Sequence, residues 1–320
     1  MSKLTLKANT KKIGKYGLNR GEAGIYDVRN PLNDLTGRQW THFTNSVYET
    51  DFSLSSEDMR LLEYLKDSLF GTRYSTNGKE SYAHKIRKQH PSPKPPQLMK
   101  SIIEFFTKKG QTILDPFMGV GGTLLGASLS DRNAIGIDLS EEYISVYKKA
   151  NKELSLREQK AIAADSTQLD KINLLKKYAF DAIITDPPYG NMLSKKRTGG
   201  DKTKEIGVST PFTDSSNDLG NLDYKNFILA LTEIISKASQ YLKPKGYIII
   251  FTKDMQPTRE HHNMLHADIA SSIMKIDKMA FKGYRIWYDK TLNLYPYGYP
   301  FSFVANQLHQ FILVFRKEKN

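Results

Sequence analysis

The sequence has no cysteine, no internal repeat and no apolar run long enough to cross a bilayer. Without cysteine the protein can form no disulfide, hold no metal through thiolates and use no cysteine nucleophile. A membrane-spanning helix needs roughly 20 consecutive apolar residues. The N-terminal stretch MSKLTLKANTKK also lacks the apolar segment of a signal peptide. We therefore expect a cytoplasmic protein without a membrane partner.

Acidic residues are few relative to basic ones, with 34 Asp and Glu against 47 Lys and Arg, a formal net charge of +13. A basic excess of this size favours a polyanionic partner, because neutralising phosphates releases counterions and drives association. The alternative is an ordinary basic cytosolic protein. The charge alone therefore indicates, without proving, a nucleic-acid partner.

Apolar strand patterns alternate with helical ones through most of the chain. A polar, basic arm and a helical or loop extension with a helix over 56–69 are expected within 1–85, ahead of a folded domain over 86–320. Helices are predicted over 140–154 and 223–242. The strands are predicted over 111–115, 133–139, 160–166, 180–186, 246–254, 284–292 and 309–317. This order predicts an α/β fold with a doubly wound, mostly parallel seven-stranded sheet and an antiparallel edge hairpin.

A glycine-containing turn, DPFMGVGGT (115–123), follows the first predicted strand of this domain. At that edge of a doubly wound sheet, glycines let backbone N–H groups approach a ligand closely. The pattern departs from the dinucleotide fingerprint, because Phe117 precedes Gly119 and Gly121. The next two strands end in Asp138 and in Asp165-Ser166, where an acid can accept hydrogen bonds from ribose hydroxyls. The set predicts a nucleoside cofactor without a pyrophosphate. The alternative is that the glycines only permit tight packing and the acids only cap helices.

A second turn, DPPY, ends the strand over 180–186 and faces the same crevice. The two prolines hold the turn rigid, so the Asp186 side chain and the Pro187 carbonyl can act as two acceptors for an exocyclic NH2 group. Tyr189, after Pro188, offers a flat ring on which a base could stack once it has left a duplex. The alternative is a proline-terminated strand with a surface tyrosine.

These two turns together resemble the S-adenosylmethionine-dependent DNA amino-methyltransferases. HPSPKPPQLMKSIIEFFTKKGQTILDPF extends the similarity before the glycine turn, and NDLGNLDYKNF, LKPKGYIIIFTKD and LHQFILVFRK extend it after DPPY. The resemblance covers most of 34–317. It implies a Rossmann-like class I methyltransferase fold, S-adenosylmethionine as cofactor, no metal, and a prokaryotic or phage protein. The implied cofactor-binding residues are Asp115, Phe117, Gly119, Gly121, Asp138, Asp165, Ser166 and Lys94. The implied catalytic residues are Asp186, Pro187, Pro188 and Tyr189.

The resemblance also implies methyl transfer to an exocyclic amine of a flipped DNA base. The Asp of DPPY favours N6 of adenine over N4 of cytosine. The absence of cysteine excludes methylation of cytosine C5, which needs a covalent thiolate adduct. Two further alternatives stay open: a tRNA guanine-N2 methyltransferase, which also carries DPPY, and a non-catalytic nucleic-acid-binding subunit. A homodimer or a restriction-modification partner can be neither predicted nor dismissed.

Basic and aromatic segments flank these motifs. KKRTGGDKTK (195–204) is predicted to grip a nucleic-acid strand, while HKIRKQH (84–90) is equally open to a surface role. REHHNMLH (259–266) has three histidines without matching carboxylates, so a metal site is not favoured. LYPYGYPFSFVAN (294–306) could enclose a flipped base or pack against the edge hairpin. Within the first segment, the expected nucleic-acid-binding residues are Lys195, Lys196, Arg197, Lys202 and Lys204.

Overall fold

The computed structural model describes most of the predicted methyltransferase domain and part of the region before it. The described residues are 14–44, 47–49, 83–193, 213, 215–255, 257, 262–288, 301 and 303–318. The helix predicted over 56–69 and the basic segment 195–204 lie outside them, as does most of 294–306.

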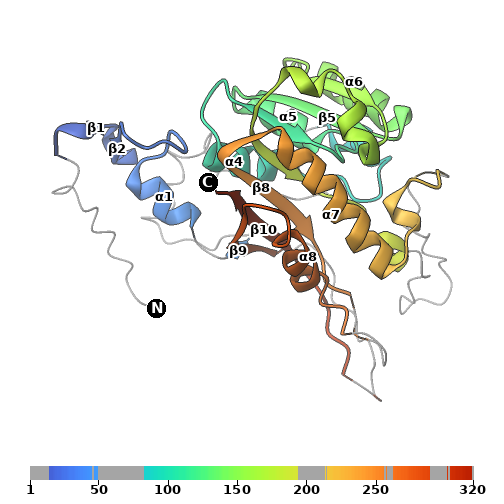
Figure 1. Ribbon diagram of the computed structural model, residues 1–320. Helices are drawn as coiled ribbons and strands as arrows, with labels where there is room; N and C mark the ends of the chain where they lie inside the picture. Colours follow the sequence, from blue (N-terminus) through green and yellow to red (C-terminus); the bar gives the residue numbers. More distant parts are fainter. Residues whose placement is uncertain are drawn as a thin grey trace.

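The centre of the fold is a twisted sheet with the strand order β3-β9-β10-β8-β7-β4-β5-β6 (Figure 1). Five strands run parallel: β4 (Thr112–Asp115), β5 (Asn133–Asp138), β6 (Lys160–Ala163), β7 (Phe180–Thr185) and β8 (Leu242–Thr252). β10 (His309–Lys317) lies antiparallel between β8 and β9 (Met279–Tyr288). The predicted doubly wound sheet and its antiparallel hairpin are confirmed.

An eighth strand, β3 (Val47–Glu49), was not predicted. It pairs in parallel with β9, in the register of Val47 with Ile286 and Glu49 with Tyr288. β3 therefore covers the edge that β9 would otherwise expose. A three-residue strand is too short to show a period in sequence, so the prediction had left these residues in the extension.

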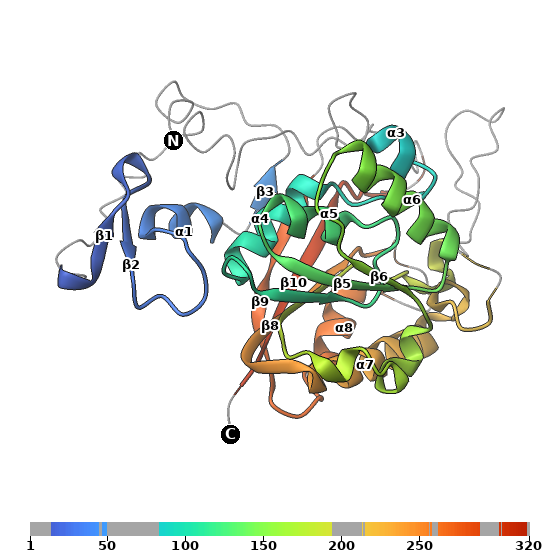
Figure 2. The same cartoon turned by 90° about the horizontal axis from the view of Figure 1, so that it is seen from above.

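Helices cover both faces of the sheet (Figure 2). α4 (Pro96–Phe106), α5 (Gly122–Leu129) and α6 (Glu141–Glu153) pack on one face, and α7 (Tyr224–Gln240) and α8 (Leu265–Ile273) pack on the other. Because side chains alternate across a strand, β8 sends Ile249 and Phe251 into the first core and Ile248 and Ile250 into the second. The sheet is thus buried on both sides, as parallel sheets require.

The long helices begin at the caps that their sequences predict. Ser140 accepts a hydrogen bond from the Tyr143 N–H (3.2 Å) at the start of α6. Asp223 accepts one from the Asn226 N–H (2.8 Å) at the start of α7. Each cap satisfies an otherwise unpaired backbone donor. The predicted helices over 140–154 and 223–242 are confirmed.

The region before the sheet forms a small unit at the left of Figure 1. It contains an antiparallel ribbon of β1 (Gly17–Asn19) and β2 (Ile25–Asp27), followed by α1 (Gly37–Phe43). Phe43 stacks on Phe105 of α4 with ring centroids 3.9 Å apart, and the Asn33 side chain donates to the Phe105 carbonyl (2.6 Å). These contacts hold the unit against the end of α4. None of the helices in the described part of the chain has the length and apolar character that crossing a bilayer requires.

Candidate active site

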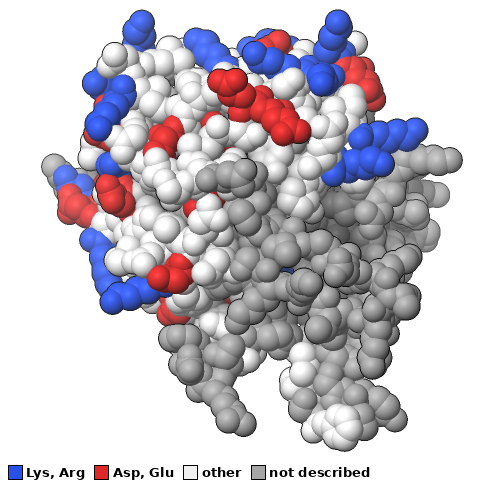
Figure 3. All heavy atoms as spheres, turned by 90° about the vertical axis from the view of Figure 1, so that its right-hand side faces the viewer, with Lys and Arg blue, Asp and Glu red and all other residues white. Residues whose placement is uncertain are grey.

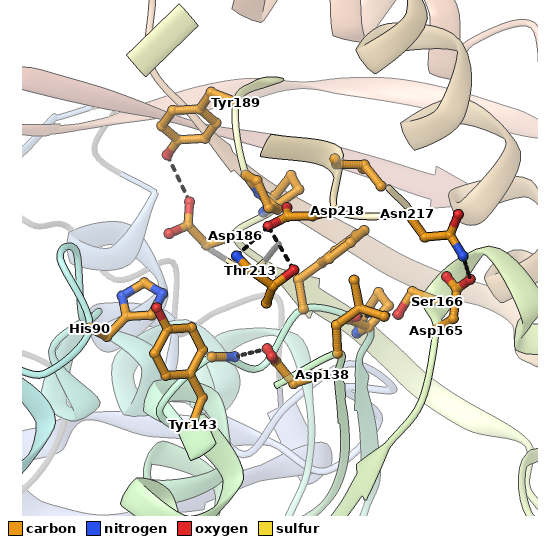
Figure 4. Close-up of a pocket in the computed structure, with 17 residues that line it drawn as sticks. His90, Asp138, Tyr143, Asp165, Ser166, Asp186, Tyr189, Thr213, Asn217 and Asp218 are labelled. Carbon is orange, nitrogen blue, oxygen red and sulfur yellow. Dashed lines mark hydrogen bonds between the residues drawn. The ribbon is translucent and has the colours of Figure 1, made fainter. Parts of the chain in front are cut away.

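A pocket opens at the carboxyl ends of β4, β5, β6 and β7, where doubly wound folds bind ligands. Its empty volume, which includes space open to solvent, is about 720 Å³. Figure 4 shows Asp186 and Tyr189 on one side, Asp165 with Asn217 on the other, and Asp138 near His90 and Tyr143. The lining residues are His90, Pro116, Phe117, Gly119, Asp138, Leu139, Tyr143, Asp165, Ser166, Asp186, Pro187, Pro188, Tyr189, Thr213, Asn217, Asp218 and Leu219. Most residues predicted for cofactor binding and all four predicted for catalysis are therefore brought together.

Asp115 lies beneath the pocket rather than in its wall. Its Oδ1 accepts hydrogen bonds from the Phe117 N–H (3.0 Å) and the Thr185 hydroxyl (2.8 Å). Burial raises the pKa of this carboxyl to about 6. Asp115 therefore fixes the glycine turn and ties β4 to the end of β7.

The two predicted glycines have different roles. Gly119 lines the pocket at φ +49°, and its N–H donates to Asp138 Oδ2 (2.8 Å). Gly121 lies outside the lining, at φ +77° and at the N-cap of α5. A Cβ on Gly121 would overlap the ring of the buried Tyr147. Gly121 therefore permits tight packing, which was one of the two alternatives that the sequence left open. Gly119 instead shapes the pocket wall.

Both strand-end acids point into the pocket while accepting local backbone donors. Asp138 also accepts the Ser140 N–H (2.9 Å), and burial raises the pKa of its carboxyl to about 6. Asp165 accepts the Thr167 N–H (2.8 Å) through one oxygen and the Asn217 amide (2.9 Å) through the other. The neighbouring Ser166 hydroxyl donates to the Pro116 carbonyl. Asp165 thus lines the pocket and also caps the short helix that follows it, whereas Asp138 lines the pocket and the cap of α6 is Ser140.

The DPPY turn does not match the alternative of a surface tyrosine. Tyr189 is 8% exposed, packs in the core beside α7 and still lines the pocket. Its hydroxyl donates to Asp186 Oδ1 (2.7 Å). Burial, with the adjacent Asp186 charge, raises the pKa of this phenol well above its ordinary value. Tyr189 is therefore a neutral donor that orients the Asp186 carboxylate.

Lys94 was expected at the cofactor, but it lies elsewhere. Its ammonium forms an ion pair with Asp186 Oδ2, and it is not among the residues that line the pocket. The proline-rich segment before α4 therefore reaches the catalytic turn. Sequence could not locate this contact, because 92 positions separate the two residues.

One wall of the pocket was not predicted as part of the site. Thr213 donates through its N–H to Asp218 Oδ2 (2.7 Å), and Asp218 Oδ1 accepts from the Gly220 N–H (2.7 Å). These contacts hold the turn that precedes α7 together, and the Asn217 amide joins this turn to Asp165. The stretch NDLGN carried a resemblance in sequence but no chemistry that would have marked it as a pocket wall.

His90 and Tyr143 form the wall beside Gly119. Their ring centroids are 4.8 Å apart, and the His90 Nδ1 accepts the Ser92 N–H (3.1 Å). Burial, together with the charges of Lys94 and Arg87, lowers the pKa of His90 to about 3. His90 is therefore a neutral imidazole at neutral pH. HPSPKPP carried the resemblance that pointed to it, although no role had been predicted.

The other singled-out segments are resolved in part. Within HKIRKQH, Arg87 is buried and donates to the Lys94 carbonyl, so it is not part of a basic surface. His262 pairs with Asp268 (3.3 Å) and His266 with Asp254 (2.7 Å), and the described residues contain no cluster of three metal-type ligands. The nucleic-acid-binding residues predicted over 195–204 lie outside the described residues.

The pocket fits the nucleoside part of the cofactor on its own chemistry. Asp138 and Asp165 present carboxylates suited to hydroxyl or amino donors. Gly119 has no side chain to narrow the pocket, and a Cβ there would come within 3.3 Å of His90. The pocket wall includes Phe117 and Leu139 for an aromatic ring. The fold and the site together define a Rossmann-like methyltransferase.

Comparison with known proteins agrees with this class. The family model of the DNA methylases (N6_N4_Mtase) matches residues 15–149 and 180–320. The chain belongs to this DNA methylase family, and its cofactor is S-adenosylmethionine.

Individual relatives are similar over shorter stretches. Type II methyltransferase M2.DpnII of Streptococcus pneumoniae is 34% identical over 130 residues, 38% of this chain and 46% of its own length. The tRNA (guanine(10)-N2)-dimethyltransferase of Pyrococcus abyssi is 33% identical over 96 residues, 30% of this chain and 28% of its own. The match thus spans less than half the length of either relative. Among solved structures, TrmN from Thermus thermophilus aligns with a TM-score of 0.47 at 15% identity, covering 73% of this chain and 52% of that one.

Proposed function

We propose that the protein transfers a methyl group from S-adenosylmethionine to the exocyclic amine of a flipped DNA base, with N6 of adenine as the favoured target. The observation that carries the proposal is one pocket with two different walls. Asp138 and Asp165 line one wall, and Asp186 with Pro187 lines the other. A nucleoside held by the first pair places its reactive group toward the second.

The roles follow from these positions. Phe117, Gly119, Asp138, Asp165 and Ser166 bind the cofactor, while Asp115 and Gly121 shape the turn. When bound, S-adenosylmethionine supplies an electrophilic methyl group on its sulfonium. The Asp186 carboxylate and the Pro187 carbonyl accept hydrogen bonds from the amine, which keeps the nitrogen lone pair available. The nitrogen–carbon bond would form as the sulfur–carbon bond breaks, and the amine would pass one proton to the Asp186 carboxylate.

DNA is the proposed substrate because the family model that matches residues 15–149 and 180–320 is that of the DNA methylases. We propose 86–320 as the methyltransferase domain and 1–85 as its extension, acting on DNA in the cytoplasm of a prokaryotic or phage-infected cell. On the face in Figure 3, described Lys and Arg side chains are spread around the rim with Asp and Glu between them. We assign DNA gripping to the basic segment that follows the DPPY turn in sequence, with Lys195, Lys196, Arg197, Lys202 and Lys204.

The β9–β10 connection supports a substrate role for its described residues. Phe301 and Phe303 are more than 90% exposed, so they do not pack against the hairpin. The connection begins beyond Tyr288 and ends before His309, which are register partners at the catalytic edge of the sheet. Of the two alternatives for 294–306, we propose enclosure of the target base.

A second candidate is a tRNA guanine-N2 methyltransferase, which the similarity to the Pyrococcus abyssi enzyme favours. Incubation with labelled S-adenosylmethionine and either duplex DNA or bulk tRNA, followed by nucleoside mass spectrometry, separates the candidates. N6-methyladenine in DNA is expected. N4-methylcytosine would change the base and keep the reaction, and label in tRNA alone would replace the DNA proposal. Cofactor binding without transfer to either would indicate a non-catalytic subunit.

A further inference from the structure

The backbone of Lys94 is fixed by contacts from two directions. The carbonyl of Lys94 accepts a hydrogen bond from Arg87, a fully buried guanidinium whose Nε also donates to the Val120 carbonyl (3.4 Å). A Cβ on Gly122 would come within 2.8 Å of the same Lys94 carbonyl. The glycine turn, the start of α5 and Lys94 are thus packed as one body.

The side chain of Lys94 lies beside two apolar rings and reaches the DPPY turn. Its Nζ lies 5.4 Å from the ring centroid of Phe251 and 5.9 Å from that of Trp287, within cation–π range. The ion pair with Asp186 is largely removed from solvent, with side-chain exposures of 7% for Lys94 and 19% for Asp186. A buried ion pair is costly unless its geometry is well satisfied. The burial of this pair therefore indicates a functional role for Lys94.

We propose that Lys94 is a positioning residue for Asp186 rather than a cofactor ligand. Lys94 holds Oδ2 and the Tyr189 hydroxyl holds Oδ1, so the carboxylate cannot rotate without breaking one contact. Each carboxylate oxygen has about two acceptor sites, so each retains one for the substrate amine. The two contacts together make Asp186 a fixed acceptor. This inference rests on the proposed function.

Other titratable groups face the same pair and are left in place by a change at Lys94. His90 approaches from the segment before α4, Asp115 from β4, and Tyr189 from the turn itself. Phe251 and Trp287, from β8 and β9, bring no charge. Removal of the Lys94 ammonium therefore leaves Asp186 Oδ2 without the contact that fixes it, while Tyr189 still holds Oδ1.

The test compares Lys94→Met with Lys243→Met. Lys243 also forms an ion pair with a carboxylate of β7, Asp181 (2.7 Å), at the opposite end of the strand. Lys94→Met should lower kcat on the methyl-accepting nucleic acid about 100-fold, the loss typical of a misplaced catalytic group. Its Kd for S-adenosylmethionine should stay within about twofold of wild type, because Lys94 does not line the pocket. Lys243→Met should leave both quantities unchanged.

Each other result overturns the inference. A large rise in the cofactor Kd with unchanged kcat would make Lys94 a cofactor ligand. An equal loss of kcat in both variants, matched by equal losses in thermal unfolding temperature, would reduce Lys94 to a structural role. If wild type methylates no nucleic acid, the proposed function fails. If wild type is active and Lys94→Met is equally active, this inference alone fails.

Discussion

The two walls of the pocket are built from different kinds of contact. On the cofactor side, Asp138 and Asp165 each accept one hydrogen bond from a backbone N–H two residues further on. Each also accepts a distant donor, the Gly119 N–H for Asp138 and the Asn217 amide for Asp165. On the catalytic side, Asp186 accepts only side-chain donors in the described structure, from Tyr189 and from the distant Lys94. Each acid of the cofactor wall thus has a local backbone contact, whereas Asp186 is held by side chains alone.

This difference has a functional consequence. Backbone donors hold Asp138 from the turn after β5 and from the glycine turn after β4, so cofactor binding should tolerate changes far from these two turns. Asp186 keeps its orientation only while α4, β7 and the DPPY turn remain in register. Mutations that loosen packing should therefore impair methyl transfer before they impair cofactor binding, and the two walls can be separated by measuring kcat and Kd independently.

The largest effect is expected at Asp186. Asp186→Ala removes the proposed acceptor of the amine and should lower kcat on the order of 10³-fold, as for groups that act in the transition state. The Kd for S-adenosylmethionine, measured by calorimetry, should change less than about threefold. Asp181→Ala, on the same strand at its far end, is the control and should leave kcat near wild type. Substantial turnover by Asp186→Ala would show that methyl transfer does not depend on Asp186 as proposed.

A comparison of two glycines tests how the cofactor wall is shaped. Gly110 and Gly121 have nearly the same positive φ, +78° and +77°, but no atom lies within 4 Å of a Cβ on Gly110. Gly110→Ala should therefore cost about 1–2 kcal/mol for the left-handed backbone alone. Gly121→Ala should cost about 1–3 kcal/mol more, because the Tyr147 ring must shift. Urea denaturation measures the free energy of unfolding of both variants. Equal losses would show that the Tyr147 ring moves aside without cost.

Asp138 tests the cofactor wall directly. Asp138→Ala removes the acceptor for the cofactor and for the Gly119 and Ser140 N–H groups. Hydrogen bonds to a charged group contribute about 1.5–3 kcal/mol, so the Kd for S-adenosylmethionine should rise about 10- to 100-fold. At saturating cofactor, kcat should stay within about threefold of wild type. Asp131→Ala, an exposed acid beside Lys109, is the control. A loss confined to kcat would reverse the assignment of the two walls.

The same contrast explains which parts of the site could be predicted from sequence. Strand-end acids, the glycine turn and DPPY follow apolar strands directly, so the position of Asp138 or Asp186 at the carboxyl edge follows from the fold class. The Lys94–Asp186 pair, the burial of Tyr189 and strand β3 depend on packing between distant segments. No local pattern encodes such contacts. The wall from Thr213 to Leu219 was missed because its residues support the site through shape and backbone hydrogen bonds.

The smallest predicted effect is the pH dependence of cofactor affinity. Burial raises the pKa of Asp138 from its ordinary 3.8 to about 6, so the folded protein binds this proton more tightly than the unfolded chain. Ionised Asp138 therefore lowers the stability of the cofactor-free protein above pH 6, and this cost disappears below pH 3.8. A ligand that donates hydrogen bonds to the carboxylate prefers the ionised form. Its binding should release a proton below pH 6, and the Kd should rise as the pH falls.

Calorimetry between pH 5 and pH 8, in buffers of different ionisation enthalpy, measures both the affinity and the proton release. Affinity should be flat above about pH 7 and should weaken toward about tenfold per pH unit well below pH 6, since one carboxyl must lose its proton. Asp138→Asn should bind more weakly at pH 8 and lose most of this dependence. Asp115, whose pKa is also raised to about 6, lies beneath the turn and accounts for what remains. An unchanged pH dependence in Asp138→Asn would assign the titrating group to Asp115. The pH-sensitive residue would then be the one that supports the glycine turn from beneath, and not the one that lines the pocket.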